Sequence, residues 1–132
     1  FMREEFNKKY GFLKSSVCQG LVWCFWHTLL WVVDSDFTDW RAIPYIISNI
    51  VVITSITILM NIFLERYNNL LYSVLLHFGF NILYVFLDAD IGFFVILTVL
   101  YLVITPIAVL ARNKTAEGLL KKNNSGERKS KE

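Results

Sequence analysis

The sequence predicts an all-α, polytopic membrane protein with four transmembrane helices and a short amphipathic helix at its N-terminus. The chain has 132 residues, of which 55% are hydrophobic, and its mean hydropathy of +0.48 is unusually high for a soluble domain. Four apolar stretches lack Lys, Arg, Asp and Glu, and each approaches the ~20 residues that cross a bilayer as a helix. Apolar and polar residues do not alternate along these stretches as they do in membrane-spanning strands. The predicted spans are residues 16–33, 43–64, 70–87 and 91–111.

The amphipathic helix is predicted from apolar residues that recur at helical spacing before the first span. Charged residues fall between them, which is typical of a helix lying on a membrane surface. Ser15 and Ser16 are expected to start the first span. The apolar positions of this segment are Met2, Phe6, Tyr10 and Leu13, and the charged ones are Glu4, Glu5, Lys8 and Lys9.

The charges predict the orientation of the chain. With four spans, both termini and the turn at residues 65–69 share one side, and that side holds twelve of the thirteen basic residues. The opposite side holds Asp34, Asp36, Asp39, Asp88 and Asp90, with only Arg41. Because positive charge collects in the cytoplasm, both termini should be cytoplasmic. Residues 1–111 then form the membrane domain, and the basic residues 112–132 form a cytoplasmic tail that we expect to be disordered.

Glycine, proline and cysteine residues within the spans predict how the helices pack. Gly20 and Gly79 permit close approach of neighbouring helices. Pro106 should kink the last span, where the Thr105 hydroxyl can bond the carbonyl that proline leaves free. Cys18 and Cys24 lie six residues apart in one helix, so they cannot pair with each other, and we expect both to be packing residues.

The two histidines of the chain are the strongest indication of a functional site, because each lies inside an apolar run. Polar groups at membrane depth usually line a cavity or a pathway. His27 is about 16 Å from the predicted cytoplasmic end of its span, His77 about 10 Å and Asn81 about 16 Å. His77 and Asn81 are four residues apart and therefore share a helix face. If the first and third spans are neighbours, the three side chains meet in one polar site. The alternative is that they only join helices by hydrogen bonds.

Metal binding is a rival role for these residues, but two His and one Asn are a poor ligand set for zinc. No acidic residue lies at that depth in the predicted spans. We therefore expect no metal and no cofactor. Membrane lipid is an expected partner, and nucleic acid is not.

Two segments that contain these residues resemble a known family. KYGFL at residues 9–13 and GLVWCFWH at residues 20–27 resemble the second motif of the CPBP family, and LLHFGFN at residues 75–81 resembles its third, HxxxN. This family comprises the CAAX-processing and bacteriocin-processing (Abi) intramembrane endopeptidases. The resemblance covers roughly residues 1–110. It implies a membrane-embedded hydrolase in which His27 helps to orient or activate water, while His77 and Asn81 stabilise the oxyanion.

The family's first motif, EExxxRG, carries the glutamate that activates water, and its position in this chain is in question. Placing it at Glu4 and Glu5 would put Lys9 where the arginine belongs and would put the glycine one residue late. Alignment on the Tyr-Gly and Trp-His landmarks instead places Phe1 just after the motif. We therefore expect a C-terminal fragment of the peptidase domain that lacks EExxxR and is inactive alone.

The resemblance implies a peptide substrate near the membrane surface, such as a prenylated or bacteriocin-like protein, in a bacterial cytoplasmic membrane. Two other functions remain open. The chain can be a non-catalytic binding or immunity protein on the same scaffold, or part of a transporter whose histidines relay protons.

Overall fold

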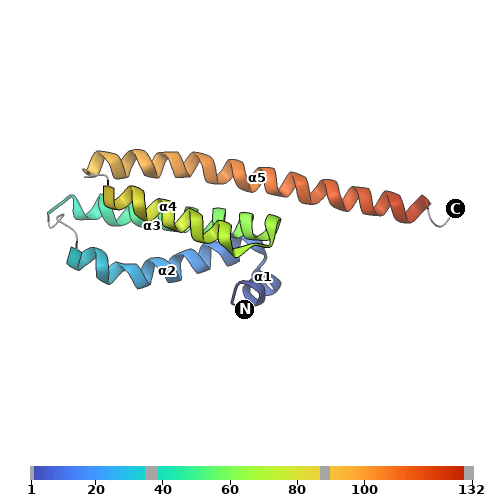
Figure 1. The fold of residues 1–132 in the computed structure, drawn as a ribbon, viewed down its shortest axis with the longest axis horizontal. Coiled ribbons are helices and arrows are strands. Elements are labelled where there is room, and N and C mark those ends of the chain that lie inside the picture. Colours follow the sequence, from blue (N-terminus) through green and yellow to red (C-terminus); the bar gives the residue numbers. More distant parts are fainter. Residues whose placement is uncertain (1, 35–38, 87–89, 130–132) are drawn as a thin grey trace.

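Five helices make up the described part of the chain, which comprises residues 2–34, 39–86 and 90–129 of a computed structural model (Figure 1). They are α1 (Met2–Tyr10), α2 (Phe12–Asp34), α3 (Ala42–Tyr67), α4 (Leu70–Phe86) and α5 (Ile91–Lys129). The predicted all-α class and the predicted N-terminal helix are confirmed. Asp36 and Asp88, which the sequence assigns to loops, lie outside the described residues.

Two of the described helices are long and apolar enough to cross a membrane: α3, and α5 over Ile91–Gly118. α4 contributes a shorter apolar run, Leu70–Ile82. These helices are consistent with a membrane protein, and the count of four spans stays a prediction.

The helix α3 is the centre of the bundle, because α2, α4 and α5 each pack against it. The hydrophobic core is formed by side chains from three helices and lies toward the end of the bundle opposite α1. Its buried members are Cys24 and Trp31 of α2, Tyr45 and Ile53 of α3, and Phe94 of α5. Cys24 is thus a packing residue as expected, whereas Cys18 is exposed and that expectation was wrong for it.

The boundary between α1 and α2 is set by Gly11, whose φ of +76° lies in the left-handed region that favours glycine. The Gly11 N–H still donates to the Asn7 carbonyl at 3.0 Å, so the chain turns without losing this hydrogen bond. α2 consequently begins at Phe12, ahead of the predicted start at Ser15 and Ser16.

Ser15 and Ser16 have a different role from the one predicted, because both are fully buried inside α2. Gln19 donates to Ser15 Oγ, and Asn61 Nδ2 of α3 donates to Ser16 Oγ, each at 3.0 Å. A hydroxyl that is buried in an apolar bundle needs such a partner. The bond between Asn61 and Ser16 ties α2 to α3 at the end of the bundle near α1.

Gly20 allows a close approach between α2 and α3. A Cβ atom at this position would lie 2.8 Å from Thr54 Cα and 3.2 Å from Thr54 Cβ. The prediction of a close contact at Gly20 is therefore correct. Its neighbour is α3, which is the second predicted span, and not α4, which is the third. Gly79 was wrongly assigned such a contact, since an added Cβ there would meet nothing within 4 Å.

A charged contact joins three helices at the end near α1. Arg112 of α5 donates to both carboxylate oxygens of Glu65 in α3, at 2.7 and 2.9 Å. Its guanidinium also lies 4.1 Å from the centre of the Phe12 ring in α2. The start of α2, the end of α3 and the middle of α5 therefore meet at Arg112.

At the opposite end, Arg41 is held by Asp39. The Arg41 guanidinium and backbone N–H donate to Asp39 Oδ1 at 3.0 and 2.9 Å. These two bonds, the guanidinium first, hold the pKa of the Asp39 carboxyl below its usual value. The one basic residue predicted on the acidic side is thus paired locally with an aspartate.

The helix α5 continues through Pro106 and through the region predicted to be a tail, as far as Lys129. Figure 1 shows its C-terminal part extending beyond the other helices. The disorder of residues 112–132 stays a prediction. Thr105 does not have the expected role, because its Oγ1 is buried and has no hydrogen-bond partner within the part of the chain that the structure describes.

Candidate functional site

The first part of the candidate site is a row of aromatic residues on α2. Trp23, His27 and Trp31 are spaced four residues apart, so they lie along one face of the helix. His27 is half-buried, and its Nδ1 lies 2.9 Å from the Trp23 carbonyl oxygen. Because a carbonyl oxygen only accepts hydrogen bonds, Nδ1 must carry the proton in this contact. When the His27 ring is neutral, its lone pair is then on Nε2.

The second part of the site is the His77–Asn81 pair on α4. Asn81 Nδ2 lies 3.0 Å from His77 Nε2. The amide nitrogen is a donor, so Nε2 of the neutral imidazole accepts and Nδ1 carries the proton. His77 is half-buried, whereas Asn81 is exposed. Asn81 therefore fixes the tautomer and orientation of His77.

Trp23 brings the two parts of the site together. Its ring centre lies 4.9 Å from that of His77 and 5.6 Å from that of His27. The two histidines thus lie against the same indole.

The helices that carry the histidines are not in direct backbone contact. Over the described residues, α2 and α4 each pack against α3 and have no close backbone approach to each other. The first and third predicted spans are therefore neighbours through their side chains, without direct backbone contact. Their side chains meet because the large Trp23 ring spans the intervening distance.

Trp23 was missed as a site residue by sequence reasoning. Its spacing of four residues from His27 is the signal that identifies it, since that spacing places both on one helix face. Sequence alone does not show that this face also meets His77.

The polar residues of α3 have structural roles. Asn49 Nδ2 donates to the Tyr45 carbonyl at 2.9 Å, and Asn61 bonds Ser16. Both are buried within the bundle, which fits their role as residues that join or stabilise helices.

The hydrogen bonds of the acidic side chains are made to groups other than the histidines, over the residues that the structure describes. Glu5 is exposed and pairs with Lys8 at 3.1 Å, and Glu65 pairs with Arg112. Glu4 is exposed on α1. The hydrogen bonds of His27 and His77 are made to a backbone carbonyl and an amide. Within the described residues, no group of three or more His, Cys, Asp or Glu side chains is placed to hold a metal ion.

In their neutral forms, the two imidazoles present different free atoms. His27 offers an Nε2 lone pair, which can accept a proton from water or hold a water molecule. His77 offers an Nδ1–H, which can donate to an oxygen that gains negative charge. These are two of the functions that hydrolysis of a peptide bond needs.

Comparison with known proteins assigns the chain to a family. Residues 1–83, well over half of the chain, match the family model described as Type II CAAX prenyl endopeptidase Rce1-like. The match includes Trp23, both histidines and Asn81. No curated protein and no solved structure matches the chain. The chain belongs to the Rce1-like family of Type II CAAX prenyl endopeptidases.

Proposed function

We propose that this chain carries the histidine part of a membrane-embedded peptidase that cleaves prenylated CAAX-type proteins. The observation that supports this function best is the pair of imidazoles against Trp23, with opposite hydrogen-bonding roles and within the segment that matches the family. Bacteriocin-like substrates remain an alternative from the motif resemblance alone.

The proposed chemistry is attack of water on the peptide carbonyl. His27 Nε2 accepts a hydrogen bond from the water and orients it. The carbonyl oxygen becomes an oxyanion and accepts a hydrogen bond from the His77 Nδ1–H, while Asn81 holds His77 in position. When the tetrahedral intermediate collapses, the C–N bond breaks and the leaving amine receives the proton that the base removed from the water.

The base that takes the proton of the water is proposed to be a carboxylate other than those of Glu4 and Glu5. Glu4 and Glu5 are solvent-exposed on α1, and Glu5 is bound to Lys8. A general base must reach the reacting water within about 2.6–3.2 Å, directly or through one further water. We therefore infer that the 132-residue chain lacks peptidase activity when it is alone.

A cleavage assay with the purified chain in detergent tests this inference. We expect a fluorogenic farnesylated CAAX peptide to be cleaved no faster than in the protein-free blank. The Glu4→Gln/Glu5→Gln double variant should behave the same way. Robust cleavage that this variant loses would show that Glu4 and Glu5 are catalytic, and robust cleavage that it retains would reveal another base within the chain.

The non-catalytic alternative differs in its outcome. A binding or immunity protein would retain a prenylated peptide without cleaving it, even when a catalytic carboxylate is supplied. The fusion experiment in the Discussion separates this alternative from the proposed peptidase.

We further propose that both termini are cytoplasmic, with the membrane crossed four times. The support is the gathering of basic residues at the end of the bundle where Glu65, Arg112 and Phe12 meet. Single cysteines at Asp39 and Lys114, in a Cys18→Ser/Cys24→Ala background, test this topology. An impermeant maleimide should label position 39 in intact cells and position 114 only after lysis. Labelling of both positions from one side would contradict the model.

A further inference from the structure

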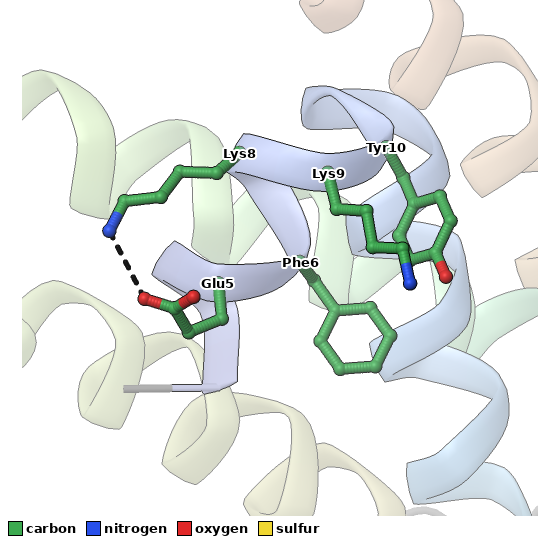
Figure 2. A pocket seen from close by; sticks show the side chains of 5 residues that line it. All are labelled: Glu5, Phe6, Lys8, Lys9 and Tyr10. Atoms are coloured by element: carbon green, nitrogen blue, oxygen red, sulfur yellow. Dashed lines mark hydrogen bonds and ion pairs between the residues drawn. The ribbon is translucent and has the colours of Figure 1, made fainter.

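An open hollow of about 390 Å³ lies on α1, apart from the histidines. Figure 2 shows its lining, with the Glu5–Lys8 ion pair on one side and the rings of Phe6 and Tyr10 on the other. The peptidase chemistry proposed above uses none of these residues.

The hollow combines an apolar surface with a positive charge that has no carboxylate partner. The Phe6 and Tyr10 ring centres are 5.8 Å apart. Lys9 extends beside them, with its Nζ 5.2 Å from the centre of the Tyr10 ring (Figure 2). Lys8 is bound to Glu5 at 3.1 Å, whereas among the described residues no acidic group pairs with Lys9. A ligand of this hollow should therefore be negatively charged and partly apolar.

The position of the hollow favours a ligand from the membrane. Gly11 joins α1 directly to α2, and α1 packs against that helix. Lys14 is exposed on the following turn, and Arg112 lies over the Phe12 ring nearby. A short amphipathic helix with aromatic and basic residues at the end of a membrane bundle lies where lipid headgroups lie.

We propose that this hollow binds an anionic glycerophospholipid. The Lys9 ammonium binds the phosphate, and the Phe6 and Tyr10 rings pack against the glycerol and the first methylenes of the acyl chains. Contact of the Lys9 ammonium with the bound phosphate should contribute about a fivefold increase in binding, the effect of one basic residue close to an anionic headgroup. The apolar contacts distinguish a lipid from free phosphate, because inorganic phosphate cannot use the rings. This proposal is independent of peptidase activity.

The test is lipid binding to the full chain in detergent, followed by native mass spectrometry. Phosphatidylglycerol should be retained in preference to phosphatidylcholine. Lys9→Gln should weaken retention of phosphatidylglycerol about fivefold, and Lys9→Arg should restore it. Phe6→Ser should weaken retention of both lipids, since it removes apolar contact. Circular dichroism shows whether each variant keeps its helices.

Lys114→Gln is the matched control, because it removes the same charge from an exposed position in α5 that does not line the hollow. It should leave lipid retention unchanged. An equal loss in Lys9→Gln and Lys114→Gln would overturn the proposal, since it would mean diffuse attraction to surface charge. Displacement of the lipid by millimolar inorganic phosphate would also overturn it, because the hollow would then be a simple anion site.

Discussion

Replacing His77 with Ala should lower kcat/KM for a prenylated peptide by about 10²–10³-fold, the usual effect of removing one oxyanion donor. The measurement uses a fusion that supplies the proposed catalytic carboxylate on a helix with the EExxxR motif, placed ahead of Phe1. His27→Ala should cost about 10²–10⁴-fold in the same fusion, because the water loses the group that orients it. Most of either loss should be in kcat, since both contacts develop in the transition state.

Controls for these variants are available on the same helices. Phe78 follows His77 in α4, and Phe25 lies two residues before His27 in α2. These two phenylalanines are 59% and 83% exposed. Phe78→Ala and Phe25→Ala should leave kcat nearly unchanged. A fusion that binds the peptide but does not cleave it would favour the non-catalytic alternative. Full activity in His77→Ala and His27→Ala would remove the histidine pair from the mechanism.

Gly20→Ala should destabilise the bundle by about 1–3 kcal/mol, the usual cost of overpacking an interior. The added Cβ would lie 2.8 Å from the backbone Cα of Thr54, so α2 and α3 must move apart. The same shift would weaken the nearby bond between Asn61 and Ser16. Alanine itself favours a helix by up to about 1 kcal/mol over glycine, so a measured loss requires that the clash outweighs this gain.

Gly79→Ala is the matched control for this substitution. It makes the same chemical change in another helix, where the added Cβ would meet nothing within 4 Å. Alanine favours a helix more than glycine does, and no clash offsets this advantage at position 79. The free energy of unfolding should therefore rise slightly. Thermal unfolding in detergent, followed by circular dichroism, measures both variants. A Gly20→Ala protein as stable as Gly79→Ala would contradict the packing of α2 on α3.

The sequence predicts the helices well because apolar runs of about 20 residues have few alternatives in a membrane. It also marks His27, His77 and Asn81, since polar groups in such runs are costly. Their assignment to one site depends on how the helices pack, which hydropathy does not determine when every face of a helix is apolar.

The errors have the same physical origin. Ser15 and Ser16 resemble a helix start because serine often caps helices. The α1–α2 boundary instead falls at Gly11, which adopts a positive φ, and leaves the serines to bond within the bundle. The central place of α3 and the contact of Trp23 with His77 are tertiary features, which local spacing does not reveal.

The tautomers of the two histidines test the account of the site most directly. The chain contains only His27 and His77, so histidine labelled with ¹⁵N gives four ring signals in detergent. We expect both neutral rings to carry the proton on Nδ1, because His27 donates from Nδ1 to the Trp23 carbonyl and His77 accepts at Nε2 from Asn81. Asn81→Leu should release His77 into a mixture of tautomers and leave His27 unchanged. Protons on Nε2 of both rings in the unmodified chain would contradict the proposed division of roles.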